Sequence, residues 1–530
     1  MDRHNRHFDV TVIGGGLHGA AIAADCAGRG LRTLLCDRDD VGGNHNLVST
    51  RLFHCGLQYL QRGDLSRVSE SLRERAILIQ RAPHLVHPTT VILPQSPGLA
   101  SRLKTNTKAW LYNLVAGQQS QLEATDIAGT ALAQPLKPLK GDPDTSCHAI
   151  RFEDALLNDA RLTIENLLLA REAGATILPH TQLSQAERSG GNWDLLLQDT
   201  EQAFSMGITS RCVINAAGPD AERVQRDILG IKSRCSATRY RAGYLVVPRL
   251  FEGSQSYLIE NEQEHVVAAL PCGEHYTLVG PLICPENRDQ AGHDALEASQ
   301  KDRLLALISR YFRTVIHKDE VVSSFAVSTS SFRETPEARP TPFSQDYVLD
   351  FNCSDGRSPA VTLFGACVNM HRVIAEQVVE QIALYLDDED VAKQDWTARA
   401  TLPGARSGDH GIDSLRLRAA ERCPWLPVPA LERMTDLYGE RFFDVIKNCK
   451  KPEDLGQELL PSLYEREVRW LRDTEWALSP EAILWHRTKL GLTLSKAKVS
   501  EFNQWFIQNF RYRSALADLH SQLQLNKEAS

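Results

Sequence analysis

One segment near the N-terminus, FDVTVIGGGLHGAAIAADCAGRGLRTLLCDRDD, limits the possible folds more than any other part of the chain. It begins at Phe8 with an apolar, β-branched run of strand length. The run leads into a GxGxxG turn made of Gly14, Gly16 and Gly19. An alanine-rich stretch then predicts a helix, and a second apolar run predicts a strand that ends at Asp37. This order of strand, turn, helix, strand and acid is typical of a dinucleotide-binding unit.

Each part of this unit has a physical role in holding a dinucleotide. Gly14 permits the tight turn, Gly16 lets the backbone approach a pyrophosphate, and Gly19 allows close contact between helix and strand. The positive end of the helix attracts phosphate, and the Asp37 carboxylate can bind ribose hydroxyls. That carboxylate disfavours the 2′-phosphate of NADP. The motif leaves NAD and FAD open, and a glycine turn without a ligand is the less favoured alternative.

Length and charge set further bounds. A chain of 530 residues predicts roughly three domains. A net charge of −8 argues against a nucleic-acid-binding protein, which needs a concentrated basic surface. The polar start MDRHNRH does not resemble a signal peptide, and no apolar run approaches the ~18 residues of a membrane span. The cysteines form no CxxC pair, which predicts no metal site and favours a reduced, cytoplasmic compartment.

Later segments divide the chain further. RCVINAAGPD and SPAVTLFGACVNMHRVIAEQVVEQIALYL both return to a buried strand that ends in small residues, so the nucleotide-binding domain is expected to be discontinuous. Between them, residues 240–283 hold short alternating strands that indicate an antiparallel sheet. Beyond residue 402 the pattern is helical, and Ser479 is expected to cap one of the helices.

The whole arrangement resembles the FAD-dependent glycerol-3-phosphate dehydrogenases, which are members of the D-amino-acid-oxidase-like flavoprotein superfamily. The resemblance extends over nearly the full length, with the same order and spacing of motifs. It is carried by IGGGLHGAAIAADCAGRGL, NDARLTIENLLLAREAGA, NAAGPD, LFGACVNMHRVIAE and TEWALSPEAILWHRTKLGL. The resemblance implies FAD rather than NAD as the cofactor.

The resemblance also implies the domain organisation. We expect an α/β fold with a Rossmann-like FAD-binding domain, interlaced with an antiparallel-sheet substrate domain and followed by a C-terminal all-helical domain. The FAD-binding domain is expected at 1–94, 150–225 and 340–395. The substrate or cap domain is expected at 95–149 and 226–339, and the helical domain at 400–525.

The activity that the resemblance implies is oxidation of the secondary alcohol of sn-glycerol 3-phosphate to dihydroxyacetone phosphate. Hydride would pass from C2 to the flavin, and a quinone or other acceptor would take the electrons. The resemblance leaves open a homodimer and a peripheral contact with the inner face of the membrane. No nucleic-acid partner is expected.

Site residues are carried over by position. The cofactor-binding candidates are Gly14, Gly15, Gly16, Gly19, Asp37, Ser49, Thr50, Gly218 and Gly365. The catalytic candidates are His54, Tyr59, His371 and Arg372, and the substrate-binding candidates are Gln58 and Arg333. For His54, a base at the flavin and a structural histidine remain equal alternatives.

The substrate segments depart from the family pattern. HCGLQYL stands where the family has HGGLRYL, so Cys55 replaces a glycine and Gln58 replaces a phosphate-binding arginine. In the segment that is FGGKLTTYR in the family, Cys367 replaces the lysine and His371 the tyrosine. These losses leave two alternatives to oxidation of glycerol 3-phosphate: a changed substrate, or a flavin-binding protein without catalysis that has a binding or regulatory role.

Overall fold

The N-terminal unit folds as the sequence predicts in the computed structural model. Strand β1 (His7–Ile13) leads through the glycine turn into helix α1 (Leu17–Gly28), and β2 (Thr33–Cys36) follows. β1 and β2 are parallel, with Val12 opposite Leu35. The small residues of α1 are buried because they face neighbouring elements on more than one side.

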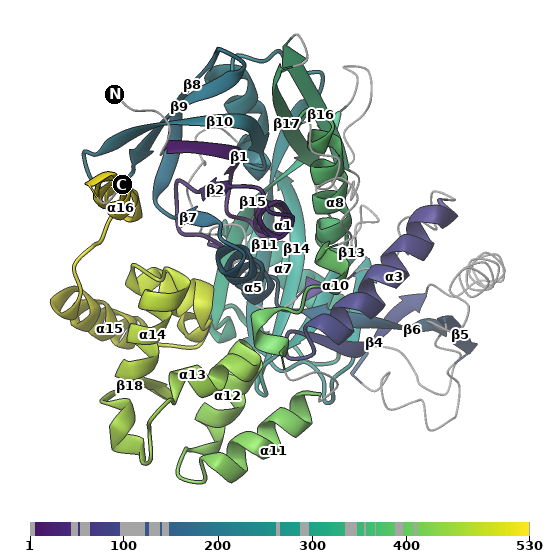
Figure 1. Ribbon diagram of the computed structural model, residues 1–530. Coiled ribbons are helices and arrows are strands. Elements are labelled where there is room, and N and C mark those ends of the chain that lie inside the picture. The colour runs from purple at the N-terminus through teal and green to yellow at the C-terminus, as the bar shows by residue number, and fades with distance from the viewer. Residues whose placement is uncertain are drawn as a thin grey trace. The chain divides into compact units, whose positions relative to one another are not determined.

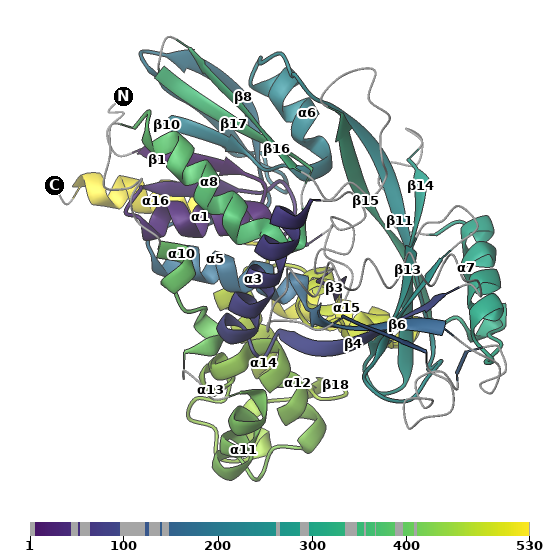
Figure 2. The ribbon, with the colours of Figure 1, turned by 90° about the vertical axis from the view of Figure 1, so that its right-hand side faces the viewer.

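Contacts divide the chain into two compact units. The first comprises Met1–Leu47, Asp159–Arg239 and Thr329–Ser530, and the second Val48–Asn158 and Tyr240–Ser328. Figures 1 and 2 show the ribbon from two directions. The structure describes residues 6–43, 51–53, 64–95, 122–126, 138–139, 148–260, 266–286, 296–333, 347–354, 357–365, 367–386, 396–406 and 411–528.

The first unit is built on a sheet with a parallel centre. Its strand order is β16-β17-β10-β1-β2-β7, with the antiparallel strands β8 and β9 joined to β10. β1 therefore lies between β10 and β2, so the glycine turn leaves the middle of the sheet. The further strands are β7 (Thr176–Leu178), β8 (Thr181–Ser189), β9 (Asn192–Asp199), β10 (Ser205–Asn215), β16 (Tyr347–Ser354) and β17 (Arg357–Gly365).

Helix α1 contacts α5 (Asp159–Glu172), α8 (His371–Ala383) and the short helix α10 (Trp396–Arg399). Figure 2 shows α1, α5 and α8 together beside the sheet. A Cβ added at Gly28 would lie 2.2 Å from the ring of Trp396, so glycine is needed for this close approach. Segments from three distant parts of the sequence thus form one dinucleotide-binding layer, and the predicted α/β fold is confirmed.

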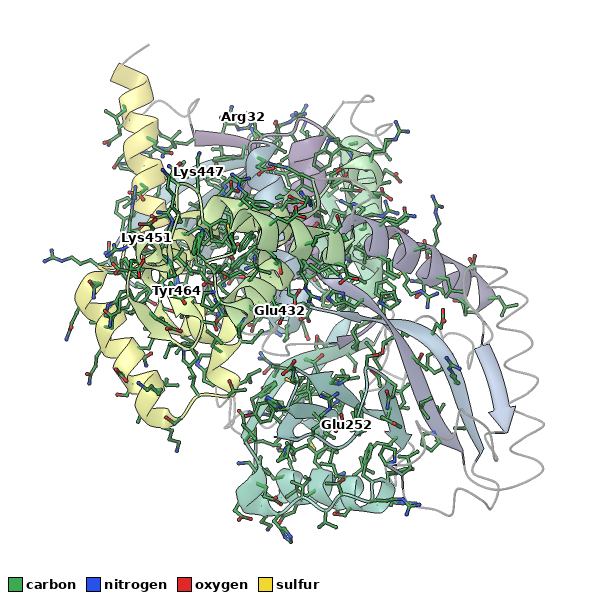
Figure 3. The ribbon with its side chains drawn as sticks, turned by 90° about the horizontal axis from the view of Figure 1, so that it is seen from below. Arg32, Glu252, Glu432, Lys447, Lys451 and Tyr464 are labelled. Carbon is green, nitrogen blue, oxygen red and sulfur yellow. The ribbon has the colours of Figure 1, made fainter. Side chains whose placement is uncertain are left out.

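The C-terminal part of the first unit is helical, as expected. Its main helices are α11 (Ile412–Arg422), α12 (Val428–Tyr438), α13 (Phe442–Val445), α14 (Glu465–Glu475), α15 (Lys496–Asn509) and α16 (Ala515–Glu528). The predicted cap is confirmed, since the Ala482 N–H donates to the Ser479 hydroxyl at 3.1 Å. Figure 3 shows the side chains of this helical part, with Lys447 and Lys451 labelled. No helix in the described part of the chain is long and apolar enough to cross a membrane.

One feature of the helical part was not predicted. A two-stranded sheet forms from β18 (Glu458–Leu460) and β19 (Leu463–Tyr464). The turn between them holds Ser462 at a φ of 65°, next to Pro461. The strands are too short to produce an alternating pattern that a sequence reading could recognise.

The second unit contains the predicted antiparallel sheet. Its order is β15-β11-β14-β13-β12-β4-β6-β3, with β5 joined to β6. The pairing of β4 with β12 is parallel, whereas β11 with β14, β14 with β13 and β13 with β12 all pair antiparallel. The strands are β3 (Arg51–Leu52), β4 (Val86–Gln95), β5 (Leu122–Asp126), β6 (His148–Leu157), β11 (Ser236–Pro248), β12 (Ser256–Glu260), β13 (Val266–Cys272), β14 (Tyr276–Pro285) and β15 (Ser323–Arg333).

Two helices in the described part of this unit contact the sheet. Helix α7 (Ala298–Tyr311) contacts β14, and its residues Leu304 and Ile308 belong to the core beneath it. Helix α3 (Leu65–Arg81) contacts β4, and Asp64 caps it by accepting from the Arg67 N–H. Both helices present one apolar face, as amphipathic helices on a sheet do.

Candidate FAD-binding site

The glycine turn has the geometry that its spacing predicts. Gly14 has a φ of 105°, which side chains other than glycine rarely adopt. A Cβ at Gly19 would lie 1.9 Å from the Gly14 carbonyl oxygen, so only glycine allows α1 to approach β1 this closely. By contrast, a Cβ at Gly16 would meet nothing within 4 Å. Glycine at 16 therefore leaves open space in front of the turn, where a ligand can approach the backbone.

The N-terminus of α1 is suited to an anion. Gly16 is its N-cap, with no side-chain cap, and its first turn contains no acidic residue. The backbone N–H groups at the start of a helix lack intrahelical acceptors, and the helix dipole adds positive potential there. A pyrophosphate fits this end of α1 because it supplies both acceptors and negative charge.

Asp37 lies at the carboxyl end of β2, beside the glycine turn. Its Oδ2 accepts from the Gly15 N–H at 2.5 Å, and its Oδ1 accepts from the Asp39 N–H at 2.9 Å. Removal from water raises the pKa of Asp37 to about 7, although these two hydrogen bonds favour the charged form. A hydroxyl donor such as a ribose would favour the ionised carboxylate further.

The carboxyl end of β10 also contacts the glycine turn. The Ala216 N–H donates to the Ile13 carbonyl at 2.9 Å, and a Cβ at Gly14 would be 2.5 Å from the Ala216 oxygen. Gly218 follows with a φ of 57°. Asp220 then pairs with Arg38 at 2.9 Å, which joins this end of β10 to the segment after β2.

The carboxyl end of β17 also lies beside the start of α1. Gly365 ends β17 with a φ of 67°, and the Cys367 carbonyl accepts from His18 Nε2 at 3.1 Å. His18 belongs to the first turn of α1, and burial lowers its pKa to about 4, so it is neutral near pH 7. Sequence reasoning missed His18. Its one available signal was a polar side chain between Leu17 and Gly19, inside an otherwise small and apolar stretch.

The structure also locates two of the catalytic candidates. His371 begins α8 and is 1% exposed, and its Nδ1 donates to the Val368 carbonyl at 2.8 Å. Arg372 is buried and pairs with Glu376 one turn later. The backbone of Arg333 ends β15. The candidates outside the described residues are Ser49, Thr50, His54, Gln58 and Tyr59.

These strand ends define a dinucleotide-binding protein, since the ends of β1, β2, β10 and β17 meet at one edge of a parallel sheet. The model of the DAO family, described as FAD dependent oxidoreductase, matches residues 9–366. The chain belongs to this family of FAD-dependent oxidoreductases. FAD is its cofactor, and the prediction of FAD is confirmed.

Individual relatives agree over almost the full length. The chain is 31% identical to a glycerol-3-phosphate dehydrogenase of Pseudomonas aeruginosa over 509 residues, 96% of each chain. It is 30% identical to a D-erythritol 1-phosphate dehydrogenase of Brucella abortus, over 94% of this chain and 97% of that one. The aerobic glycerol-3-phosphate dehydrogenase of Escherichia coli is 28% identical, with 96% and 99% covered.

A solved structure supports the fold. The glycerol-3-phosphate dehydrogenase of Bacillus halodurans complexed with FAD matches with a TM-score of 0.72 at 21% identity, over 99% of this chain and 94% of that chain. At this identity the likeness concerns the fold alone. The three relatives named above are all enzymes, so the alternative of a flavin-binding protein without catalysis is not favoured.

Proposed function

We propose that this chain oxidises the secondary alcohol of sn-glycerol 3-phosphate to dihydroxyacetone phosphate. The observation that carries the proposal is the agreement with glycerol-3-phosphate dehydrogenases over 96% or more of both chains. A match of that length includes the antiparallel sheet and the helical part as well as the dinucleotide-binding layer. FAD, when bound, supplies the hydride acceptor for such an oxidation.

The protein residues would orient the alcohol, take its proton and bind its phosphate. We assign the proton to a histidine, His54 or His371, because imidazole is the usual base near neutral pH. Tyr59 and Arg372 complete the proposed catalytic set. Gln58 and Arg333 are the proposed phosphate ligands. A neutral glutamine gives a hydrogen bond about half as strong as the charged bond from an arginine, so weaker phosphate binding is expected.

A quinone is the proposed electron acceptor. Because quinones are held in the lipid phase, we propose a cytoplasmic protein that contacts the inner face of the membrane peripherally. Flotation of the purified protein with quinone-containing vesicles, and quinone reduction in their presence, would test this part separately from oxidation of the alcohol.

The central experiment is anaerobic reduction of the bound flavin. The purified protein is expected to be yellow, and its visible absorbance should bleach when glycerol 3-phosphate is added without oxygen. Glycerol, which lacks the phosphate, is the matched control and should bleach the flavin far more slowly. A flavin that remains oxidised with glycerol 3-phosphate would contradict the proposal.

D-Erythritol 1-phosphate should be compared in the same experiment. The Brucella abortus relative carries that name at almost the same identity, and Cys55 and Gln58 depart from the glycerol-3-phosphate pattern. Bleaching by D-erythritol 1-phosphate at concentrations where glycerol 3-phosphate has no effect would assign the chain to the longer substrate.

A further inference from the structure

The segment from Asp37 to Gly43 is held directly against the glycine turn. The Gly15 N–H donates to Asp37, and the Gly42 N–H donates to the Gly15 carbonyl at 2.9 Å. A Cβ at Gly15 would lie 2.9 Å from Cγ1 of Val41, which is fully buried. A displacement of this segment must therefore displace Gly15 as well.

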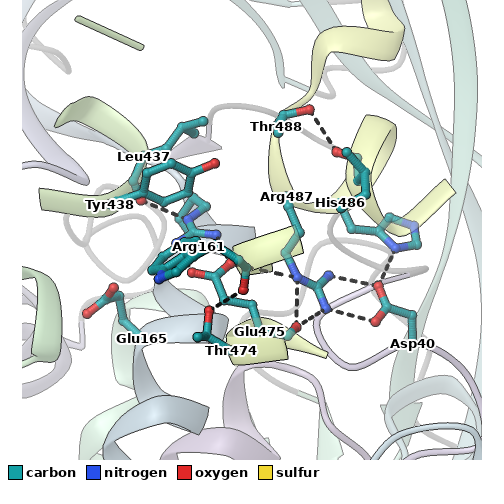
Figure 4. Close-up of polar contacts among 12 residues, drawn as sticks. Asp40, Arg161, Glu165, Leu437, Tyr438, Thr474, Glu475, His486, Arg487 and Thr488 are labelled. Atoms are coloured by element: carbon teal, nitrogen blue, oxygen red, sulfur yellow. Dashed lines mark hydrogen bonds and ion pairs between the residues drawn. The ribbon is translucent and has the colours of Figure 1, made fainter. Parts of the chain in front are cut away.

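Asp40, in the middle of this segment, is bound by the C-terminal helical part. Two guanidinium nitrogens of Arg487, Nη1 and Nη2, donate to the two carboxylate oxygens of Asp40, each at 2.8 Å. His486 Nδ1 donates to Asp40 Oδ2 at 2.6 Å. The three side chains are almost completely buried, and Figure 4 shows them together. Bidentate pairing of this kind fixes the orientation of the two side chains in addition to pairing their charges.

The local backbone explains how two consecutive residues reach one carboxylate. The segment Ala482–Arg487 is a π-helix, in which the Thr488 N–H donates to the Ile483 carbonyl five residues earlier. Its wider turn brings consecutive side chains closer in direction than an α-helix does, and such turns are frequent at functional sites. The π-helix ends at Arg487, two residues before Lys489, which adopts a φ of 59°.

Further hydrogen bonds hold the Arg487 guanidinium in place. Its Nη2 and Nε donate to the Glu475 carbonyl at 2.7 and 3.2 Å. The Glu475 carboxylate pairs with Arg161 of α5 and with Arg441. Figure 4 shows this chain of contacts from Asp40 through Arg487 to Glu475 and Arg161. The guanidinium therefore has little freedom to follow Asp40 if the segment moves.

We propose that His486 and Arg487 are positioning residues for FAD, which act through Asp40 to hold the Asp37–Gly43 segment against the glycine turn. The helical part of the chain thereby determines how tightly the dinucleotide site retains its cofactor. His486 also contacts the segment directly, since a Cβ at Gly43 would be 3.0 Å from its Cε1. The inference rests on FAD binding at the glycine turn and goes beyond the proposed oxidation of a polyol phosphate.

The chain supplies a matched control. Arg433 pairs with Glu467 at 2.6 Å, and Tyr438 contributes a hydrogen bond to the same carboxylate. In this ion pair Glu467 is fully buried and Arg433 is partly buried, and the pair lies within the helical part, but none of its members belongs to Asp37–Gly43. Arg433→Met thus removes an equivalent guanidinium without touching the segment.

The experiment is titration of apoprotein with FAD, followed by flavin fluorescence, for the wild type, Arg487→Met, Asp40→Asn and Arg433→Met. Circular dichroism and thermal unfolding of each apoprotein report folding separately. Arg487→Met and Asp40→Asn should weaken FAD binding by roughly tenfold to a hundredfold. This is the range by which affinity falls in metal sites when residues that orient the metal ligands are removed. Arg433→Met should change FAD affinity by less than about twofold, because the hydrogen-bond partners of Arg433, Glu467 and Ser462, lie outside the segment.

Further variants separate positioning from general destabilisation. Arg487→Lys, which keeps the charge but loses the bidentate geometry, should bind FAD with intermediate affinity. The double variant Arg487→Met with Asp40→Asn should be no worse than either single variant, because both act through one contact. If Arg487→Met does not fold, Asp40→Asn and His486→Gln decide the question.

Two results would overturn the inference. One is FAD affinity within about twofold of wild type in folded Asp40→Asn and Arg487→Met proteins, which lies within the scatter of independent sites. The other is an equal loss of affinity in Arg433→Met. If the wild-type apoprotein itself failed to bind FAD, the failure would concern the cofactor site and not the positioning residues.

Discussion

Arg161 and Glu475 form a buried bidentate ion pair between α5 and the end of α14, with Nη1–Oε2 and Nη2–Oε1 distances of 2.5 and 2.8 Å. Arg441 adds a second guanidinium at 2.7 Å from the same carboxylate. Neither Arg161 nor Glu475 has appreciable contact with solvent. The Glu475 carboxylate thus pairs with two buried guanidinium groups at the junction of the dinucleotide-binding layer and the helical part, and the Nε of a third, Arg487, lies 4.0 Å from its Oε2.

Glu475→Gln should therefore be strongly destabilising. The change removes the carboxylate that pairs with buried Arg161 and leaves Arg441 with Glu165 at 3.5 Å, and breaking a buried pair in this way typically costs about 3–5 kcal/mol. The measurement is the free energy of unfolding in urea. Glu501→Gln is the control, because Glu501 pairs with Lys498 on the surface, where such pairs contribute about 0.3–0.5 kcal/mol. Equal changes in the free energy of unfolding for the two substitutions would show that the buried ion pairs contribute no more to stability than the surface pair.

The pH dependence of stability should reflect Asp40 and Glu475. Burial alone would raise the pKa of both carboxyls, but Arg487 and His486 lower that of Asp40, and Arg161 and Arg441 lower that of Glu475, each to about 2. A depressed pKa stabilises the folded protein above the unfolded value near 4, and that contribution is lost as the pH falls toward 2.

Comparison of wild type with Asp40→Asn isolates one of these contributions. The difference in their free energies of unfolding should be largest and constant above about pH 5, and should shrink as the pH falls from about 4 toward 2. Chemical denaturation at a series of pH values provides the measurement. A difference that does not change across this window would mean that Asp40 has the same pKa in the folded and unfolded protein.

The local parts of this architecture could be predicted from the sequence, whereas the contacts among Asp40, His486 and Arg487 could not. The turn at Gly14 and the helix that follows depend on neighbouring residues, so their spacing is visible in the chain. The Asp40–Arg487 pair joins positions 447 residues apart. No periodicity predicts such a pairing, and a π-helix has no pattern that distinguishes it from an α-helix in sequence. His18 was missed because its partner is a backbone carbonyl, which leaves no trace in residue type.

FAD affinity should rise with pH because the Asp37 carboxyl ionises. Burial raises the pKa of this carboxyl to about 7, so the apoprotein holds it largely protonated at pH 6 and ionised at pH 8. For stability the sign is the reverse of that for Asp40, since a raised carboxyl pKa disfavours the folded apoprotein as the pH rises from about 4 to 7. A ribose hydroxyl donates best to the ionised form, and binding should therefore tighten between pH 6 and 8.

Asp37→Asn tests this assignment. The variant should bind FAD roughly tenfold more weakly at pH 8, consistent with the loss of about 1.4 kcal/mol from a charged hydrogen bond. Its affinity should also vary less between pH 6 and 8 than that of wild type. A pH profile parallel to the wild type would assign the titration to another group.

Gly16→Ala should impair FAD binding without impairing folding. The added Cβ would meet no protein atom within 4 Å, and the N-cap backbone at φ −75° tolerates alanine. The methyl group would instead occupy the open space in front of the turn. A loss of FAD affinity of at least about tenfold is expected, with the apoprotein unfolding temperature unchanged.

Gly207→Ala is the matched control for that substitution. A Cβ at Gly207 also meets nothing within 4 Å, and this glycine lies on the exposed part of β10, away from its carboxyl end. FAD titration of both variants should separate them clearly. Normal FAD affinity in Gly16→Ala would exclude close approach of the cofactor to this backbone position.

Gln58→Arg should strengthen the binding of glycerol 3-phosphate if the phosphate site has kept its family position. A charged donor in place of a neutral amide roughly doubles the strength of a hydrogen bond to phosphate. An improvement of about tenfold in the KM for glycerol 3-phosphate, with little change in kcat, is the expected signature of added uniform binding. Gln58→Lys separates charge from geometry, because lysine binds phosphate as a point charge without the planar fork of arginine. No change in KM with either substitution would mean that the pocket is built for a different substrate, and D-erythritol 1-phosphate would then be tested on the same variants.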